Sequence, residues 1–201
     1  MSKRATKSEA PTKTHVATKT QVATKTHVAA KTQAPTKTHT ATRGPSSWSQ
    51  KLDQDEGLPK VVPIGPTMSK QWGEGTVVVP APREVDAIMK SVPSGKLITI
   101  QEIRAIVAER HGATIGCPLT VGIFAWIAAH AAEDDRKAKR RGATPYWRTL
   151  KSGGYLNEKY PGGVPAHKEK LEAEGHDIVQ RGQKLAVADY ERYLVDSDET
   201  N

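Results

Sequence analysis

The sequence predicts a mainly α-helical domain with a small β-hairpin near its C-terminus, preceded by a basic arm that does not fold. Three observations lead to this prediction: an N-terminal repeat without large apolar residues, apolar residues at helical spacing in the middle, and a two-stranded pattern near the end. A chain of 201 residues has room for one ordinary domain and an appendage.

The arm, residues 1–47, carries the net charge. The whole chain has 30 Lys and Arg against 22 Asp and Glu, and the arm holds nine of these cations and one acid. Its formal charge is therefore +8, and the remaining residues are neutral in sum, with 21 cations and 21 acids. A concentrated positive charge favours an anionic partner such as nucleic acid.

The arm repeats every six residues, and the repeat places a lysine at each of Lys13, Lys19, Lys25, Lys31 and Lys37. It contains no aromatic residue, Leu or Ile. It therefore buries too little apolar surface to offset the entropy of ordering, and we expect disorder. We expect its lysines to contact phosphates; a solubilising tail and an organelle transit peptide are the alternatives.

Residues 48–80 are rich in Pro and Gly, which favours an irregular linker or a subdomain with few strands. Trp48 and Trp72 are expected to dock on the folded part. The compact domain is expected at residues 81–195, and residues 196–201 form an acidic tail that we expect to fray.

Two helices open the compact domain. The first is predicted to end before Pro93, and its apolar residues recur at the i, i+3, i+4 spacing as Val85, Ile88 and Met89. The second starts with the capping box Thr99–Glu102 and stops at Gly112.

A third helix is predicted from Pro118, a favoured first residue, towards Gly142. Its first half is apolar nearly all round, which indicates burial. Its second half holds three acids followed by a cluster that includes Arg136, Lys137, Arg140 and Arg141. This end is either a solvated helix terminus or a patch that contacts phosphates.

The C-terminal part predicts an amphipathic helix around residues 168–174, ended by Gly175, and then a hairpin. The hairpin pairs residues 178–180 with 184–187 across a turn at 181–183. Helices followed by a hairpin favour a winged helix-turn-helix, with the hairpin as the wing.

The single cysteine, Cys117, cannot form an intrachain disulfide, and no Cys/His cluster has metal-ligand spacing. No apolar run reaches the roughly 18 residues of a membrane helix. We therefore expect an intracellular, cytoplasmic protein, associated with the nucleoid if bacterial, without cofactor, metal or membrane contact.

Five motifs in residues 84–175 resemble the DNA-binding domain of the methylguanine-DNA methyltransferases and their alkyltransferase-like relatives. Residues 92–99 are similar to the Ile-Pro-x-Gly-x-Val-x-Thr entry of the family's helix-turn-helix, and Val121-Gly122 to the Val-Gly of its recognition helix. Residues 144–148 stand where the family has Pro-Cys-His-Arg. Residues 160–163 and 171–175 resemble its Tyr-Ser-Gly-Gly and Leu-Leu-x-x-Glu-Gly motifs.

The departures from the family decide the expected chemistry. The family's repair enzymes transfer an alkyl group from guanine to the motif's Cys, which the neighbouring His activates. Here Tyr146 takes the Cys position and Trp147 the His position. A phenol and an indole cannot replace a thiolate and its base, so we predict no alkyl transfer. An enzyme that uses Cys117 instead is a further hypothesis.

The resemblance also implies a base pocket, formed by Tyr146, Trp147, Tyr160 and Glu174. Leu119 replaces the arginine that enters the base stack in the family, and Ile100 replaces the tyrosine that helps to rotate the phosphate. Besides the arm lysines, the DNA-binding residues expected are Thr99, Ile100, Leu119, Thr120, Arg136, Lys137, Arg140, Arg141 and Arg148. The alternative is that Tyr146 and Trp147 fill a pocket that no longer opens.

We therefore expect a monomeric, non-enzymatic DNA-binding protein of the alkyltransferase-like type. Its partners would be double-stranded DNA and DNA repair proteins, which it would signal after recognising alkylated guanine. The basic arm would add affinity that does not depend on DNA sequence. The alternative is a structural or protein-interaction module whose base pocket is filled.

Overall fold

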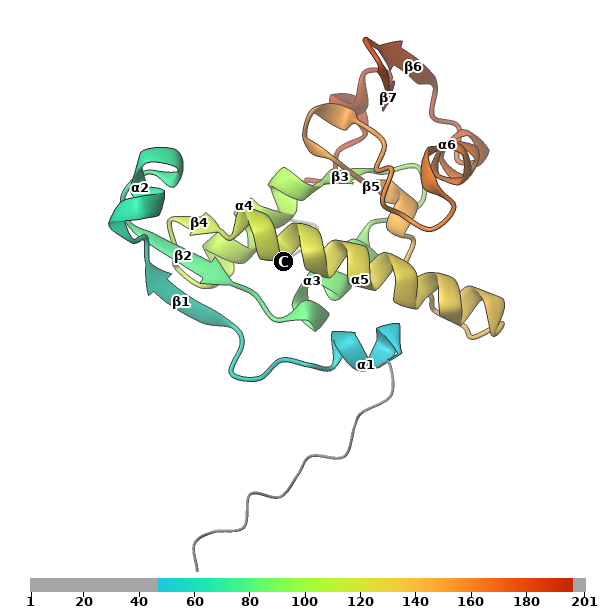
Figure 1. Ribbon diagram of the computed structural model, residues 1–201. Coiled ribbons are helices and arrows are strands. Elements are labelled where there is room, and N and C mark those ends of the chain that lie inside the picture. The colour runs from blue at the N-terminus through green and yellow to red at the C-terminus, as the bar shows by residue number, and fades with distance from the viewer. Residues whose placement is uncertain (1–46, 197–201) are drawn as a thin grey trace, which may run out of the picture. The chain divides into compact units, whose positions relative to one another are not determined.

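A computed structural model describes residues 47–196 (Figure 1). The helices are α1 (Trp48–Leu52), α2 (Pro66–Trp72), α3 (Pro82–Ser91), α4 (Ile100–Arg110), α5 (Pro118–Lys137) and α6 (Gly163–Ala173). The strands are β1 (Lys60–Pro63), β2 (Thr76–Val79), β3 (Ile98–Thr99), β4 (Ile115–Gly116), β5 (Thr149–Leu150), β6 (Ile178–Arg181) and β7 (Lys184–Val187). Three short 3-10 helices are η1 (Tyr146–Arg148), η2 (Ser152–Gly154) and η3 (Tyr190–Tyr193).

The predictions for the arm up to residue 46 and for the tail after residue 196 lie outside the described residues. Within those residues, no helix is long and apolar enough to cross a membrane.

Residues 48–80 do not form the irregular linker expected from their Pro and Gly content. They contain α1, α2 and a sheet of order β1-β2-β4, in which β1 and β2 are antiparallel and β2 and β4 parallel. Pro63 ends the edge strand β1, and Pro66 is the first residue of α2. Both positions tolerate proline, because neither requires its missing N–H. The prolines therefore mark element boundaries in a folded segment.

The helix α5 is the centre of the main apolar cluster, and α3 and α4 pack against it. The stripe of α5 that faces this cluster carries Val121, Ala125, Ala128 and Ala132, all of them buried. The small alanine side chains let the neighbouring helices approach closely. The predicted capping box is present, since Thr99 accepts from the Glu102 N–H and Glu102 accepts from the Thr99 N–H. The apolar face predicted for α3, Val85, Ile88 and Met89, is also buried.

The third and fourth helices differ in length from the prediction. The α5 helix starts at Pro118 as predicted but ends at Lys137, five residues before Gly142. The α6 helix starts at Gly163, five residues before the predicted Lys168, and ends where expected, before Gly175.

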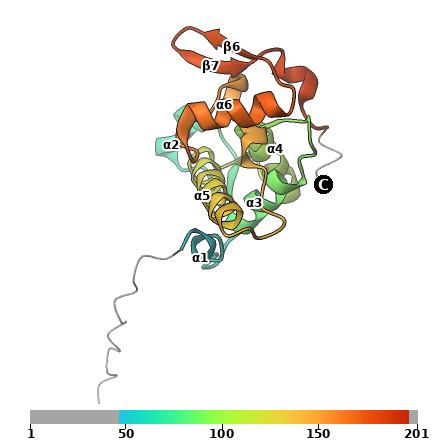
Figure 2. The same cartoon turned by 90° about the vertical axis from the view of Figure 1, so that its right-hand side faces the viewer.

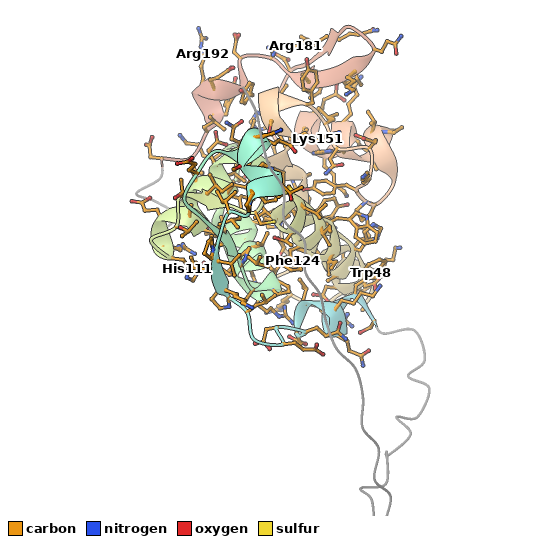
Figure 3. The ribbon with its side chains drawn as sticks, turned by 60° about the vertical axis from the view of Figure 1, so that its left-hand side comes forward. Trp48, His111, Phe124, Lys151, Arg181 and Arg192 are labelled. Carbon is orange, nitrogen blue, oxygen red and sulfur yellow. The ribbon has the colours of Figure 1, made fainter. Side chains whose placement is uncertain are left out.

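The short helix α1 is fixed to the middle of α5 by aromatic contacts. The Trp48 ring lies edge-on to Trp126, with centroids 4.8 Å apart, and stacks on His130 at 4.6 Å. The Lys51 ammonium lies 4.0 Å from the Trp48 ring centre. Docking of Trp48 is thus as expected, and Figure 3 shows its side chain at the α1 end of the fold.

The C-terminal elements form a second apolar cluster, built on Leu97, Leu150, Leu156, Leu171 and Val187. Figure 2 shows α6 and the β6–β7 hairpin together on this side. The hairpin pairs Ile178 with Val187 and Arg181 with Lys184. It confirms the predicted hairpin, with the first strand one residue longer than expected.

Candidate functional site: a groove between an apolar helix face and a basic wall

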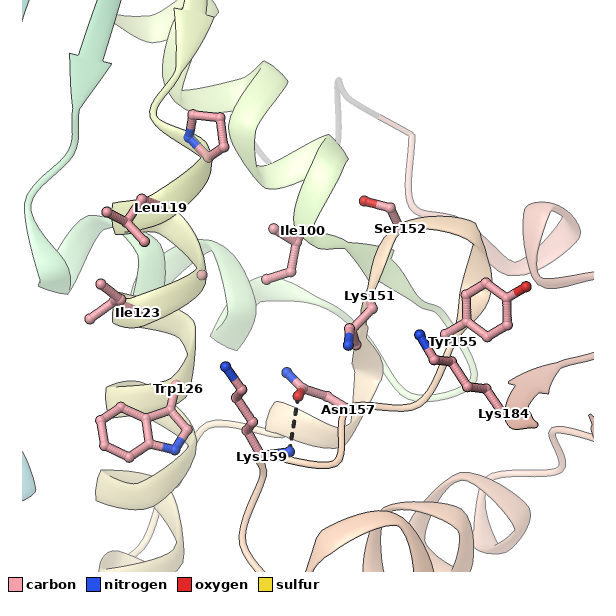
Figure 4. Close-up of a pocket in the computed structure, with 12 residues that line it drawn as sticks. Ile100, Leu119, Ile123, Trp126, Lys151, Ser152, Tyr155, Asn157, Lys159 and Lys184 are labelled. Carbon is pink, nitrogen blue, oxygen red and sulfur yellow. Dashed lines mark hydrogen bonds between the residues drawn. The ribbon is translucent and has the colours of Figure 1, made fainter. Parts of the chain in front are cut away.

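A groove of about 900 Å³ lies between the first half of α5 and the segments that follow β5 (Figure 4). One wall is apolar and consists of Ile100, Pro118, Leu119, Gly122, Ile123 and Trp126. The opposite wall is polar and consists of Lys151, Ser152, Tyr155, Asn157, Lys159 and Lys184. We call these the apolar wall and the basic wall of the groove.

The apolar wall exposes side chains that a soluble protein usually buries. Leu119 is 67% exposed and Ile123 is 41% exposed, and they are two of the four large apolar side chains exposed in residues 47–196. Leu119, Ile123 and Trp126 follow the i, i+4, i+7 spacing, so they share one face of α5. The opposite face of the same helix packs in the core, so α5 carries apolar side chains both in the core and on an exposed face. Such a patch in a groove indicates a contact surface.

The basic wall takes its three lysines from three separate segments. Lys151 follows β5, Lys159 lies in the loop before α6, and Lys184 starts β7. Lys151 forms an ion pair with Glu158 at 3.1 Å, and the Lys184 ammonium lies 5.9 Å from the Tyr155 ring centre. Within the described residues Lys159 has no acidic partner. Folding therefore gathers cations that lie far apart in the sequence.

The buried imidazole of His167 positions the loop that carries Asn157 and Lys159. Its Nδ1 accepts from the Asn157 backbone N–H at 3.0 Å. Its Nε2 must then carry the ring proton, which it donates to the Trp147 carbonyl at 2.8 Å. Burial lowers the pKa of His167 to about 4, although the contact with the Trp147 carbonyl favours the charged form. The neutral ring thus joins α6, η1 and the loop.

Arg148 and Glu174 form a half-buried ion pair near this region. The guanidinium donates through Nε and Nη2 to the Glu174 carboxylate, at 2.9 and 2.7 Å, and through Nη1 to the Val92 carbonyl at 2.7 Å. The Trp147 indole N–H donates to the same carboxylate at 2.9 Å. Burial opposes ionisation of Glu174, but hydrogen bonds from Arg148 and Trp147 outweigh it and lower its pKa. Arg148, Glu174 and the Trp147 indole N–H therefore all have hydrogen-bond partners within the protein.

Tyr146 does not line the open base pocket that the resemblance implies, and its burial favours the alternative of a filled pocket. Its side chain has no exposed surface and lies among other aromatic rings, 5.6 Å from Trp147 and 5.5 Å from Tyr160 between centroids. Its hydroxyl donates to Glu133 at 3.1 Å. Burial and the negative Glu133 raise the pKa of Tyr146 above its usual value. The ring fills the core at the position of the family's cysteine.

The other expected base-pocket residues also lie outside the groove lining. Tyr160 is 2% exposed. Trp147 is half-buried, with Arg136, Arg148 and Lys170 5.1 to 5.7 Å from its ring centre. Together with the engaged Glu174, these positions do not form the open base pocket that the resemblance implies.

The expected DNA-binding residues fall into separate places. Ile100 and Leu119 line the groove. Thr99 is buried as the α4 N-cap, Thr120 is half-buried, and Arg148 is held by Glu174. Arg136, Lys137, Arg140 and Arg141 are exposed at the other end of α5. Lys13, Lys19, Lys25, Lys31 and Lys37 lie outside the described residues.

Sequence reasoning missed most of the groove. The i, i+4, i+7 spacing of Leu119, Ile123 and Trp126 marks one face of a helix. The first half of this helix is apolar nearly all round, however, so all of it was expected to be buried. No sequence signal placed Lys159 or Lys184 opposite this face of α5, because their positions depend on how the segments after β5 fold back over the helix. Cys117, the candidate for an alternative nucleophile, is buried. Among the described residues, no group of acids, histidines and cysteines could hold a metal ion.

Comparisons with known proteins give one structural likeness. The chain is similar to Atl1 of S. pombe, solved in complex with damaged DNA containing O6-carboxymethylguanine. The sequences are 21% identical over 57% of this chain and 94% of that chain, with a TM-score of 0.42. No family model and no curated protein matches.

The neutral state of His167 predicts acid sensitivity. Its pKa is about 4 in the fold and about 6.5 in an unfolded chain, so the unfolded state takes up the proton first as the pH falls. The contribution of His167 to stability is complete above pH 6.5 and is lost progressively between pH 6.5 and 4, by about 3 kcal/mol. Urea unfolding across this range measures it.

The matched variant is His167→Gln, which cannot titrate but offers an acceptor and a donor. We expect it to be less stable than the wild type at pH 7 and to lose less stability on acidification. Some sensitivity should remain, because burial also lowers the pKa of His176. An unchanged slope of stability against pH in His167→Gln would contradict the assignment.

Proposed function

We propose that this chain is a non-enzymatic protein that binds double-stranded DNA in the groove between α5 and the basic wall. The observation that carries the proposal is the pairing of the two walls: exposed Leu119 and Ile123 face lysines from three segments. Lysines suit the phosphate backbone, and apolar side chains suit bases and sugars. A groove with both chemistries fits a nucleic acid better than it fits a small apolar ligand.

The arrangement of elements supports a winged helix-turn-helix as the binding architecture. In this proposal α4 and α5 are the helix-turn-helix, and the first turns of α5 enter DNA. The β6–β7 hairpin is the wing, and it supplies Lys184 to the basic wall. The expected monomer, the repair partners and the cytoplasmic location stay predictions.

The absence of alkyl transfer follows from the side chains at the position of the family's cysteine. Tyr146 is buried, and its raised pKa keeps the phenol protonated. Trp147 has no basic nitrogen to activate it. Cys117 is also buried, so we propose that no cysteine accepts an alkyl group.

The first experiment removes charge from the basic wall. We expect Lys159→Gln/Lys184→Gln, which we call the groove variant, to bind a 20-base-pair duplex more weakly. The slope of log affinity against log salt should become less negative by about 2, because about 0.9 counterions are released per phosphate contact. Fluorescence anisotropy across a salt series measures both.

The matched control is Lys60→Gln/Lys70→Gln, which removes two exposed lysines from β1 and α2. It changes the net charge equally without touching the groove. If the control and the groove variant lose the same affinity, the groove is not the binding site.

The second experiment tests the arm. A chain that begins at residue 47 keeps Ser47, which caps α1, and loses nine cations. If all nine contact phosphates, the salt slope becomes less negative by about 8, and partial contact gives a proportional change. Equal slopes for the full and shortened chains would show that the arm serves another purpose.

The third experiment asks whether an alkylated base is read. The resemblance implies recognition of alkylguanine, whereas the buried Tyr146 favours a filled pocket. We therefore expect duplexes with and without O6-methylguanine to compete equally, within about threefold. A preference above tenfold would show that the core around Tyr146 opens, and would restore lesion recognition and repair signalling as the function.

The alternative is a protein-interaction module, and the filled Tyr146 pocket is the observation that favours it. Its apolar wall would then receive a protein segment. Failure of the wild type to bind any duplex at low salt would decide for this alternative.

A further inference from the structure

The C-terminal end of α5 carries a second basic surface, away from the groove. Its members are Lys90, Lys137, Lys139 and Arg141, which we call the basic tip. All four are exposed, and the Lys90 ammonium lies beside Gly142, so α3 contributes to the tip. Figure 1 shows this end of α5 reaching beyond its neighbours. None of the four has an acidic partner within the described part of the chain.

The acids beside the tip are largely engaged elsewhere. Glu133 accepts from the Tyr146 hydroxyl and lies 3.9 Å from Arg136. Asp135 binds Arg140 at 2.6 Å. Asp134 alone stays exposed among the three acids of this helix end. The tip therefore holds an excess of positive charge that the fold does not neutralise.

The backbone at the tip holds a lysine in a conformation that usually favours glycine. The Lys139 N–H donates to the Arg136 carbonyl at 3.0 Å, and the Arg140 N–H to the Asp135 carbonyl at 2.8 Å. This is the Schellman helix ending, whose left-handed residue is usually glycine. Here Lys139 takes that conformation, with φ of 55°. A lysine at this position lowers stability but places an ammonium at the apex of the turn.

The tip and the groove lie at opposite ends of α5. Leu119 and Lys137 are 18 residues apart on α5, which corresponds to about 27 Å along the helix. Trp126 and Lys137 are about three turns apart, so they share one side of α5. Trp48 of α1 covers this side, because it contacts Trp126 and His130. Trp48 therefore lies against α5 between the groove and the tip.

We propose that the basic tip binds the phosphate backbone of a second DNA segment, so that one chain bridges two duplexes. The inference rests on the proposed function, because the first duplex occupies the groove. The tip has no aromatic or exposed apolar member, which suits contact with phosphates and does not read bases. The resulting activity is joining of DNA segments without sequence preference.

The test measures capture of a second duplex by the full chain. A biotinylated 20-base-pair duplex on beads binds the protein at low salt, and a fluorescent duplex of another sequence is then added. Light scattering confirms one chain per complex. We expect wild-type protein to capture the second duplex, and Lys137→Gln/Arg141→Gln to capture at least fivefold less. Its affinity for a single duplex should fall less than twofold.

Two further variants separate charge at the tip from other effects. Lys60→Gln/Lys70→Gln should capture like the wild type. Lys139→Gly should capture less while its melting temperature rises by about 2 to 4 °C, because glycine adopts the left-handed conformation without strain. A role limited to capping the helix would not weaken capture in a variant that is more stable.

The outcomes distinguish the two proposals. Equal capture by the wild type and Lys137→Gln/Arg141→Gln overturns bridging by the tip. An equal loss of first-duplex affinity and of capture in that variant also overturns it, since the tip then contacts the first duplex. If the wild type stays on the immobilised duplex but captures nothing, bridging alone fails. If it does not bind the immobilised duplex, both proposals fail.

Discussion

The neutral imidazole of His167 is the contact on which the groove depends. It is buried and bonded on both sides, to the Asn157 N–H and to the Trp147 carbonyl. It therefore fixes the distance between α6, η1 and the loop that carries Lys159. The Arg148–Glu174 pair fixes the same region to the segment before α4 through the Val92 carbonyl. Hydrogen bonds of the buried His167 and of the half-buried Arg148 and Glu174 thus hold the segments that carry the basic wall.

The region around Tyr146 shows how a large aromatic side chain fills the core at η1. Tyr146 stands where the resemblance places a reactive cysteine, and its ring packs with Trp147 and Tyr160 while its hydroxyl reaches Glu133. A phenol in this place contributes apolar contact and one hydrogen bond. The exposed apolar side chains Leu119 and Ile123 lie on α5, with Trp126 beside them in the groove lining.

Local signals predicted the helices well, and tertiary contacts account for what they missed. The Thr99 capping box and Pro118 marked helix starts, because both act within one turn of the chain. Residues 48–80 were misread because proline content does not reveal whether each proline lies at a permitted boundary. The resemblance singled out Ile100 and Leu119 as DNA-binding residues, and both line the groove. It gave no sign that Glu174 engages the Arg148 side chain. Lys159 and Lys184 come to the same wall of the groove only through tertiary packing, which no local sequence pattern predicts.

The burial of Cys117 has a practical consequence for spectroscopy. It is the chain's single cysteine and is 7% exposed at the start of α5. A thiol-reactive dye will therefore modify the native protein slowly. A cysteine introduced at an exposed position, such as Gln183 in the hairpin turn, would take up the dye selectively. A fluorophore can thus be attached at one chosen position without first replacing Cys117 at the start of α5.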